Sequence, residues 1–262
     1  MQAFSLLDVT RQAAVATVTL ARPEIHNAFN PAMIAELSAC FEALAVDPEV
    51  RVVVLTGAGR SFCAGADLQW MRESLGWSYE ENEADAEQLS SMYETINSLP
   101  KPLIGRINGA ALGGGAGLVA CCDMAIAAEE ATFGFTEVRV GLVPAVISRF
   151  VVPKIGASHA RALFVSGARV DARRALAAGL IHDVAPRAEL DAAVERAARE
   201  MIEGGPEAQA RVKALLDTLP ALLPQEQRAF TIAAIAAART GDEGQAGLAA
   251  FLEKRRPPWG DG

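Results

Sequence analysis

The sequence predicts an α/β fold with parallel strands, followed by a helical region at its C-terminal end. Two observations predict the sheet. Short β-branched runs recur in the first half of the chain, and an amphipathic or glycine-opened helix separates one run from the next. A third observation predicts the helical region: after about Ala160 these runs disappear, and Ala, Arg and Glu recur at helical spacing.

The first unit has a strand on each side of a capped helix. Val15–Leu20 and Val50–Thr56 are β-branched runs that end in turn signals, and the second is apolar enough to be buried on both faces. Between them, Asn30 is the predicted N-cap of an amphipathic helix with Pro31 in its first turn. A strand, helix, strand order of this kind predicts parallel pairing, with ligand sites at the C-terminal ends of the strands.

The second unit repeats the order, and helices alone follow it. Leu103–Ile107 and Met124–Ala128 are the predicted strands, with a glycine-opened helix between them. Gly- and Pro-rich breaks separate three later helices, which are Asp171–Ala178, Ala188–Glu203 and Gln225–Ala238. We expect a core over residues 1–200 and a helical region over residues 201–262, whose alanine-rich surfaces suit close packing within the chain or against another subunit.

Length and charge exclude several classes of protein. The chain of 262 residues is 51% hydrophobic and 21% charged, as is typical of a globular protein with one large domain or a large and a small one. Its net charge of -8 argues against a nucleic-acid partner. No apolar run approaches the roughly 20 residues of a membrane span, and the start resembles no signal peptide. A cytoplasmic location is expected.

Cysteine and histidine spacing predicts no metal site. The four cysteines form no CxxC motif and have no histidine at ligand spacing, so we expect buried thiols. The three histidines are scattered along the chain and indicate no Ser-His-Asp triad. Only His26 lies in a loop rich in polar residues.

Two glycine-rich stretches are candidates for a ligand site. In the first, TGAGRSFCAGADLQWM, the small residues at positions 64–66 would let backbone approach a ligand, although a generic turn would look the same. The second, Asn108–Leu118, lies between a strand and a helix and matches neither the dinucleotide fingerprint nor the P-loop. Unobstructed N–H groups at a helix N-terminus would suit a negatively charged oxygen, as an oxyanion hole requires.

A single carboxylate stands out after these stretches. Glu137 is flanked by apolar and aromatic residues, and burial there would raise its pKa toward the range of a general acid or base. The alternative is a surface carboxylate or an ion pair with Arg139.

Together these segments resemble the crotonase family, the enoyl-CoA hydratases and isomerases. The matching segments occur in family order over nearly the whole chain and are RPEIHNAFN (22–30), SFCAGADL (61–68), NGAALGGGAGL (108–118), FGFTEVRVGLVP (133–144) and FLEKRRPPW (251–259). The resemblance implies a crotonase-like spiral of ββα units with a C-terminal helical trimerisation region, and a homotrimer or a hexamer made from two trimers.

The resemblance also implies the site residues. Backbone N–H groups of Ala66 and Gly114 would hold a thioester carbonyl, and Glu137 would be the catalytic carboxylate. The substrate is an acyl-CoA thioester, and since CoA is part of the substrate no separate cofactor is expected. Contacts to the substrate or CoA are implied for Glu24, His26, Ala28, Ala64, Ala66, Asp67, Leu68, Gly113 and Gly114, and for Lys254, which could serve a neighbouring subunit.

One position departs from the family pattern. The best-known hydratases carry two glutamates, and the first of these falls on Gly117. Glu137 alone would have to carry out both proton transfers of hydration, or it would shuttle a proton between carbons as an isomerase does. A CoA-binding protein without catalysis is the third alternative.

Finer similarity favours one subgroup of substrates. GADLQWM, GLVACCDMAIA and EVRVGLVPAVISRFVV look like the methylglutaconyl-CoA and isohexenylglutaconyl-CoA hydratases of leucine or isovalerate and terpenoid acid catabolism. Their substrates carry a second carboxylate, which needs a cation near the acyl end. The candidates are Arg72, Arg139 and Arg149, although a solvated or structural role is favoured for each of them taken singly.

Overall fold

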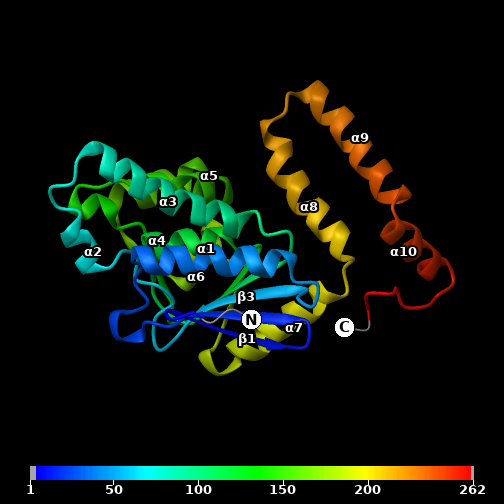
Figure 1. Cartoon of the computed structure of the whole chain (residues 1–262), viewed down its shortest axis with the longest axis horizontal. Helices are drawn as coiled ribbons and strands as arrows, with labels where there is room; N and C mark the ends of the chain where they lie inside the picture. Colours follow the sequence, from blue (N-terminus) through cyan, green and yellow to red (C-terminus); the bar gives the residue numbers. More distant parts are fainter. Residues whose placement is uncertain (1–3, 261–262) are drawn as a thin grey trace.

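The computed structural model describes residues 4–260 and has two sheets (Figure 1). The six strands of the large sheet, in spatial order, are β1 (Leu7–Gln12), β2 (Val15–Leu20), β3 (Val52–Gly57), β4 (Leu103–Ile107), β6 (Met124–Ala128) and β9 (Asp183–Ala185). The small sheet contains β5 (Ala111–Leu112), β7 (Thr132–Gly134) and β8 (Arg169–Asp171).

Helices make up most of the remaining structure. The α-helices are α1 (Pro31–Val46), α2 (Leu68–Glu73), α3 (Tyr79–Asn97), α4 (Gly114–Cys121), α5 (Ala145–Ser166), α6 (Ala172–Ala178), α7 (Leu190–Ile202), α8 (Pro206–Thr218), α9 (Pro224–Thr240) and α10 (Asp242–Leu252). Short 3-10 helices are η1 (Pro23–Ile25), η2 (Glu137–Val140), η3 (Arg187–Glu189) and η4 (Leu219–Ala221).

The large sheet is covered on both faces, as a predominantly parallel sheet requires. In Figure 1, α1, α3 and α4 lie on one side of it and α7 on the other. Alternate residues of β3 face the two layers: Val53 and Leu55 join the larger core with α1 and α3, while Val52 and Val54 pack with α7. All six residues of β3 are buried, which confirms the prediction of a strand covered on both faces.

The predicted repeat of strand, helix and strand is confirmed for the centre of the sheet. β2, β3, β4, β6 and β9 pair in parallel. Asn30 caps α1 as expected, because its side chain accepts a hydrogen bond from the N–H of Met33. The buried thiols are also confirmed, since all four cysteines are free and buried.

The expectation that strands end near Ala160 is wrong. β8 and β9 follow that position, and each has only three residues, which is too short for a period of two to be visible in the sequence. β1 was also absent from the prediction and pairs antiparallel with β2. Helix α5 spans a proline and a residue with non-helical backbone, Pro153 and Gly156, which explains why helical periodicity did not reveal it.

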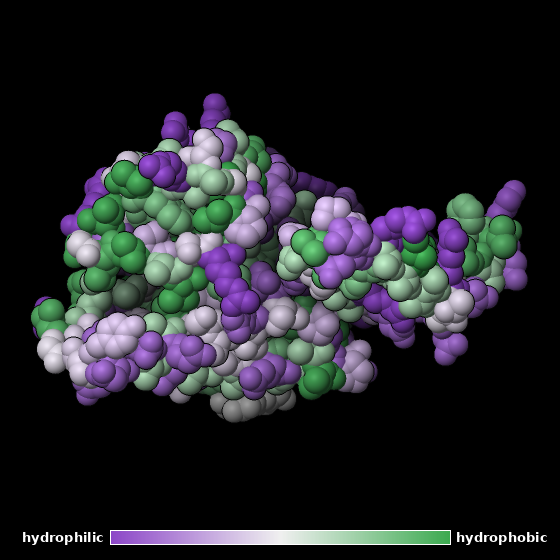
Figure 2. All heavy atoms as spheres, turned by 90° about the horizontal axis from the view of Figure 1, so that it is seen from above, coloured by the Kyte–Doolittle hydropathy of each residue, from purple (hydrophilic) through white to green (hydrophobic). Residues whose placement is uncertain are grey.

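The last three helices form an arm that extends from the core (Figures 1 and 2). α8 and α9 bury no residue, and α10 buries only Ala250. Lys213 ties the arm to the core, since its ammonium lies 2.8 Å from the Asp123 carboxylate and 3.1 Å from the carbonyl oxygen of Lys101. Large apolar side chains remain exposed on the arm, namely Val212, Leu216, Leu223, Ile232, Ile235, Leu248, Phe251 and Leu252.

No helix within residues 4–260 combines the length and the apolar character that crossing a membrane needs.

Candidate active site

Two glycine-rich loops meet at the end of the large sheet, and each presents one backbone N–H. The first loop, residues 61–67, follows β3, and the second leads from β5 into α4. A Cβ added to Gly65 would lie 2.9 Å from the carbonyl oxygen of Leu112 and 3.7 Å from the nitrogen of Gly114, so the loops are in contact. Gly65 has φ +94°, which a residue with a side chain rarely adopts.

The N–H of Ala66 points away from its own loop. The carbonyl of Gly65, in the same peptide, accepts a hydrogen bond from the N–H of Phe29 at 2.7 Å. In a planar trans peptide the C=O and the N–H point in opposite directions, so the N–H of Ala66 points away from Phe29. It has no acceptor among the described residues.

The N–H of Gly114 is presented in the same way by the start of α4. The carbonyl of Gly113 accepts from the N–H of Gly117 at 3.2 Å, which leaves the N–H of Gly114 directed out of the helix N-terminus. Gly113 takes φ +51° and ψ -121° to make this turn, and its own N–H is bound to the carbonyl of Gly134 at 2.8 Å. No acceptor within residues 4–260 pairs with the N–H of Gly114.

Helix α4 adds to the positive potential at this point. Its N-terminus carries a partial positive charge from the aligned peptide dipoles, and anions are stabilised there. The ammonium of Lys154 donates to the carbonyl oxygens of Ala120 and Cys122 at the opposite end, where a cation is favourable. No local sequence pattern singles out Lys154, because its role depends on α5 lying against α4.

Glu137 lies beside the start of α4. Its Oε1 is 3.2 Å from the position that a Cβ on Gly113 would occupy, which places the carboxyl group at the residue before Gly114. Its Oε2 is buried and has no hydrogen-bond partner in the described part of the chain. Burial raises the pKa of Glu137, because desolvation penalises its charged form. The alternative of an ion pair with Arg139 is wrong, since the described residues contain no such pair.

Gly117 lies one helical turn into α4 and has no space for a side chain. A Cβ there would be 2.5 Å from Cγ2 of Ile147 and 3.1 Å from Cε1 of Tyr93. The phenolic O–H of Tyr93 donates to the carbonyl of Gly114 at 2.7 Å, which holds the first turn of α4 in place. A carboxylate at position 117 would therefore require Ile147 and Tyr93 to move.

We expect Gly117→Ala to destabilise the fold. Overpacking a core costs about 1–3 kcal/mol, which exceeds the roughly 1 kcal/mol that alanine gains over glycine within a helix. Denaturant unfolding would measure the change. With Ile147→Ala as the background, the same glycine substitution should cost less, because Cγ2 of Ile147 is gone, although Cβ of residue 147 at 3.0 Å and Cε1 of Tyr93 at 3.1 Å remain close. An equal loss in both backgrounds would contradict this account.

The structure brings most predicted site residues together. The residues that converge are Ala66, Gly113, Gly114 and Glu137. Ala64 lies in the loop of residues 61–67, which we call the donor loop, and Ala28 lies in the segment that is hydrogen-bonded to it. Leu68 is exposed at the start of α2. Glu24 is exposed on η1, and the ring of His26 contacts Ser61 and Arg60. Lys254 follows α10, at the opposite end of the molecule from α2 in Figure 1, so this chain does not bring it to its own site.

The three arginines proposed for a second carboxylate occupy different surroundings. Arg149 forms an ion pair with Glu94 on the surface. The stem of Arg139 packs beside Gly167, since a Cβ at that glycine would lie 3.1 Å from Cγ of the arginine. Arg72 is exposed in the last turn of α2 and has no ion pair in the described part of the chain.

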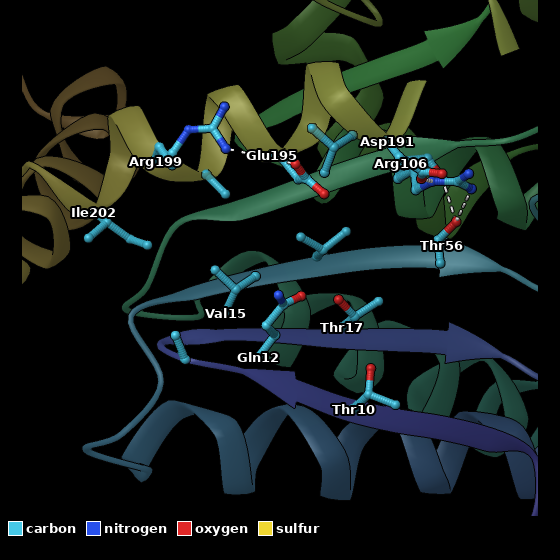
Figure 3. A pocket seen from close by; sticks show the side chains of 14 residues that line it. Thr10, Gln12, Val15, Thr17, Thr56, Arg106, Asp191, Glu195, Arg199 and Ile202 are labelled. Carbon is cyan, nitrogen blue, oxygen red and sulfur yellow. Dashed lines mark hydrogen bonds and ion pairs between the residues drawn. The ribbon is translucent and has the colours of Figure 1, made fainter. Parts of the chain in front are cut away.

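A separate groove of about 530 Å³ lies between α7 and the outer face of β1–β3 (Figure 3). Its charged side chains neutralise each other: Arg106 is 2.6 Å from Asp191, and Arg199 is 3.8 Å from Glu195. Thr56 accepts a hydrogen bond from Arg106 at 3.3 Å. No unpaired titratable group converges there, and the described residues contain no cluster of metal ligands, so the two loops and Glu137 remain the candidate site.

Two unpaired backbone N–H groups with a half-buried carboxylate nearby have the arrangement of a site that could stabilise negative charge on a carbonyl oxygen while a proton is moved. The chain belongs to the enoyl-CoA hydratase/isomerase family, the crotonases, because the model of that family matches residues 10–262. It is thus an enzyme with the crotonase fold.

Individual relatives agree with this assignment. The chain is 35% identical to the 2,3-dehydroadipyl-CoA hydratase of Escherichia coli over 260 residues. The aligned region covers 97% of this chain and 98% of that relative. Among solved structures, an enoyl-CoA hydratase from Shewanella pealeana is 38% identical, with a TM-score of 0.94 and coverage of 98% of this chain and 96% of that one. Pseudomonas aeruginosa AtuE is 36% identical, with a TM-score of 0.94 and coverage of 98% and 100%.

Proposed function

We propose that the protein adds water across the double bond of a 2-enoyl-CoA whose acyl group carries a second carboxylate, as 3-methylglutaconyl-CoA does. The observation that carries the proposal is the buried, unpartnered Oε2 of Glu137 beside two unpaired N–H groups. A buried acceptor without a partner is costly, and a water or a substrate proton at that position would satisfy it. The reaction needs no cofactor beyond the CoA of the substrate.

The proposed mechanism uses one carboxylate twice. Glu137 accepts a proton from a water whose oxygen bonds to C3 of the enoyl group. The electron pair of the double bond moves onto the thioester oxygen, where the N–H groups of Ala66 and Gly114 stabilise the enolate. The protonated Glu137 then delivers its proton to C2. One molecule of water is consumed, and the carboxylate is regenerated.

Two arguments support a dicarboxylic substrate. The motifs GADLQWM and EVRVGLVPAVISRFVV resemble hydratases of methylglutaconyl-type substrates. The relative from Escherichia coli is named for 2,3-dehydroadipyl-CoA, which also has a carboxylate at the far end of its acyl chain.

Arg72 is our first candidate to bind this group, because it lies on the helix that starts directly after the donor loop and is free of any ion pair in the described residues. Catabolism of leucine, isovalerate or terpenoid acids would supply such substrates.

The packing of Gly117 favours one alternative, a double-bond isomerase. With one carboxylate, Glu137 could remove a proton from C2 of a 3-enoyl-CoA and return it to C4, using the same oxyanion hole. A family member that binds CoA without catalysis is the remaining alternative, and the raised pKa of Glu137 speaks against it.

The distinguishing experiment offers crotonyl-CoA, 3-methylglutaconyl-CoA and a 3-enoyl-CoA to the purified protein. Loss of the conjugated absorbance, with a product heavier by one water, supports hydration, and faster loss with the branched dicarboxylate supports the substrate class. Gain of conjugation from the 3-enoyl-CoA with no change of mass would make the protein an isomerase. Thermal stabilisation by acyl-CoA without any turnover would support a binding role and contradict the proposal.

We also propose that the protein works as a homo-oligomer, a trimer or a pair of trimers. The exposed apolar side chains of α8–α10 support this, because an arm that buries almost nothing within its own chain is suited to burial against other copies. Lys254 would then reach the site of a neighbouring subunit. A cytoplasmic location stays a prediction.

The pH dependence of the reaction rate is expected to follow the deprotonation of the Glu137 carboxyl group. Since the base must be ionised to accept a proton from water, kcat/KM should rise with pH as Glu137 loses its proton. The midpoint should lie above the usual range of glutamate, because desolvation raises this pKa. Initial rates over a series of buffers would measure the profile. A midpoint at or below the ordinary glutamate range would show that another group controls the reaction.

A further inference from the structure

Arg22 joins the two segments that present the N–H of Ala66. It lies between β2 and η1, and its guanidinium donates to the carbonyl oxygen of Ala28 at 2.8 Å and to Oδ2 of Asp67 at 2.9 Å. The Arg22 and Asp67 side chains are only 15% and 14% exposed. A guanidinium that makes two charge-assisted hydrogen bonds at this burial is held more rigidly than one in a surface ion pair.

The same segments are joined through their backbones. The N–H of Phe29 donates to the carbonyl of Gly65, and the N–H of Asp67 donates to the carbonyl of Phe29, both at 2.7 Å. Ala66 lies between these two bonds and pairs with Phe29 as an isolated parallel bridge. The direction of its N–H therefore depends on how residues 65–67 are held against residue 29.

Both carboxylate oxygens of Asp67 already accept a hydrogen bond from within the chain. Its Oδ1 accepts from the N–H of Gln69 at 2.8 Å and caps α2, while its Oδ2 accepts from Arg22. Removal of the guanidinium would leave Oδ2 and the carbonyl of Ala28 without their donor. Both atoms flank the bridge between Phe29 and Ala66, so residues 65–67 would then be held against Phe29 by the two backbone bonds alone.

We propose that Arg22 is a positioning residue for the oxyanion hole, and that Asp67 is its partner rather than a contact of the substrate. The ion pair fixes the peptide between Gly65 and Ala66, so that the N–H of Ala66 is aimed at the carbonyl oxygen of the bound thioester. This inference rests on the proposed thioester chemistry. It assigns Arg22 no contact with the substrate.

The test compares the polarisation of a bound carbonyl with catalysis. An enoyl-CoA with an aromatic substituent absorbs at longer wavelength when its carbonyl is polarised by hydrogen bonds, and its C=O stretch falls in frequency. Wild type should show both shifts. In Arg22→Gln both should shrink, and kcat should fall about 10- to 100-fold, as expected for misplacement of a reacting group by about 1 Å. Affinity for CoA alone should change much less, because CoA has no acyl carbonyl.

Three further variants define the pair. Asp67→Asn should have the same defect as Arg22→Gln, and the double variant should be no worse than either single one, because the two act through one contact. Arg22→Lys keeps the charge but not the two-pronged geometry, so it should recover part of the carbonyl shift. If Arg22→Gln does not fold, Arg22→Lys and Asp67→Asn carry the same comparison.

Lys213→Gln is the matched control. Lys213, like Arg22, joins a carboxylate and a main-chain carbonyl from another segment, but it does so far from the donor loop. It should lose stability with the carbonyl shift and kcat unchanged. If the Arg22 variants bind the chromophoric thioester with the full wild-type shift and kcat, Arg22 does not position the donor. If wild type itself shows no shift with any enoyl-CoA, the proposed function fails, and the inference fails with it.

Discussion

Replacement of Glu137 by glutamine is expected to lower kcat by about 10²- to 10⁴-fold, the range for loss of a general acid or base. The amide has nearly the shape of the carboxyl group but cannot accept a proton from water. Because Oε2 has no partner within the described residues, no internal hydrogen bond is lost with it. Turnover of the preferred enoyl-CoA at saturating concentration would measure the effect, and both hydration and isomerisation should be lost together.

The same substitution should not destabilise the protein near neutral pH. The pKa of Glu137 is higher in the folded state than in the unfolded chain, so the folded state binds the proton more tightly. The stability that this group contributes is therefore present at low pH and is lost as the pH rises through the interval between the two pKa values. Near neutral pH the carboxylate is a cost, and the Tm of Glu137→Gln should equal or exceed that of wild type. A lower Tm together with lost activity would point to unfolding instead of chemistry.

Ala66→Pro should lower kcat by about 10²- to 10³-fold, because proline lacks the N–H that the oxyanion hole needs. Position 66 suits this test because its N–H pairs with nothing in the described chain and its side chain is exposed. The other donor cannot be tested in this way. Any Cβ on Gly114 would lie 2.5 Å from Phe29 and 2.9 Å from the hydroxyl of Tyr93.

Ala66→Ser is the control for that substitution, since it changes the side chain and keeps the N–H. Steady-state kinetics of both variants and binding of CoA alone would separate the effects. We expect the serine variant to stay within a few-fold of wild type, and both variants to keep their affinity for CoA. A serine variant as inactive as the proline variant would mean that the shape of the loop, and not its N–H, supports the reaction.

Local patterns were sufficient where one segment determines its own structure. The strand over Val15–Leu20 and the cap of α1 at Asn30 follow from residues within a few positions of each other, and both are confirmed. The motifs at 61–68 and 108–118 identified the loops that carry the two donors. The elements that the sequence did not reveal are short or interrupted. β8 and β9 have three residues each, and α5 contains Pro153, so neither periodicity nor propensity revealed them.

The sequence by itself indicated the family, through its resemblance over five segments, and it singled out the two glycine-rich loops and Glu137, because motifs and an acidic residue in an apolar stretch are local properties. Only the tertiary structure decided what depends on contacts between distant segments. It joined Arg22 to Asp67 across 45 positions, closed the space at Gly117 with Ile147 and Tyr93, and left Oε2 of Glu137 buried without a partner. Partners, distances and burial arise only when chain segments pack, and they set the direction of an N–H and the pKa of a carboxyl group.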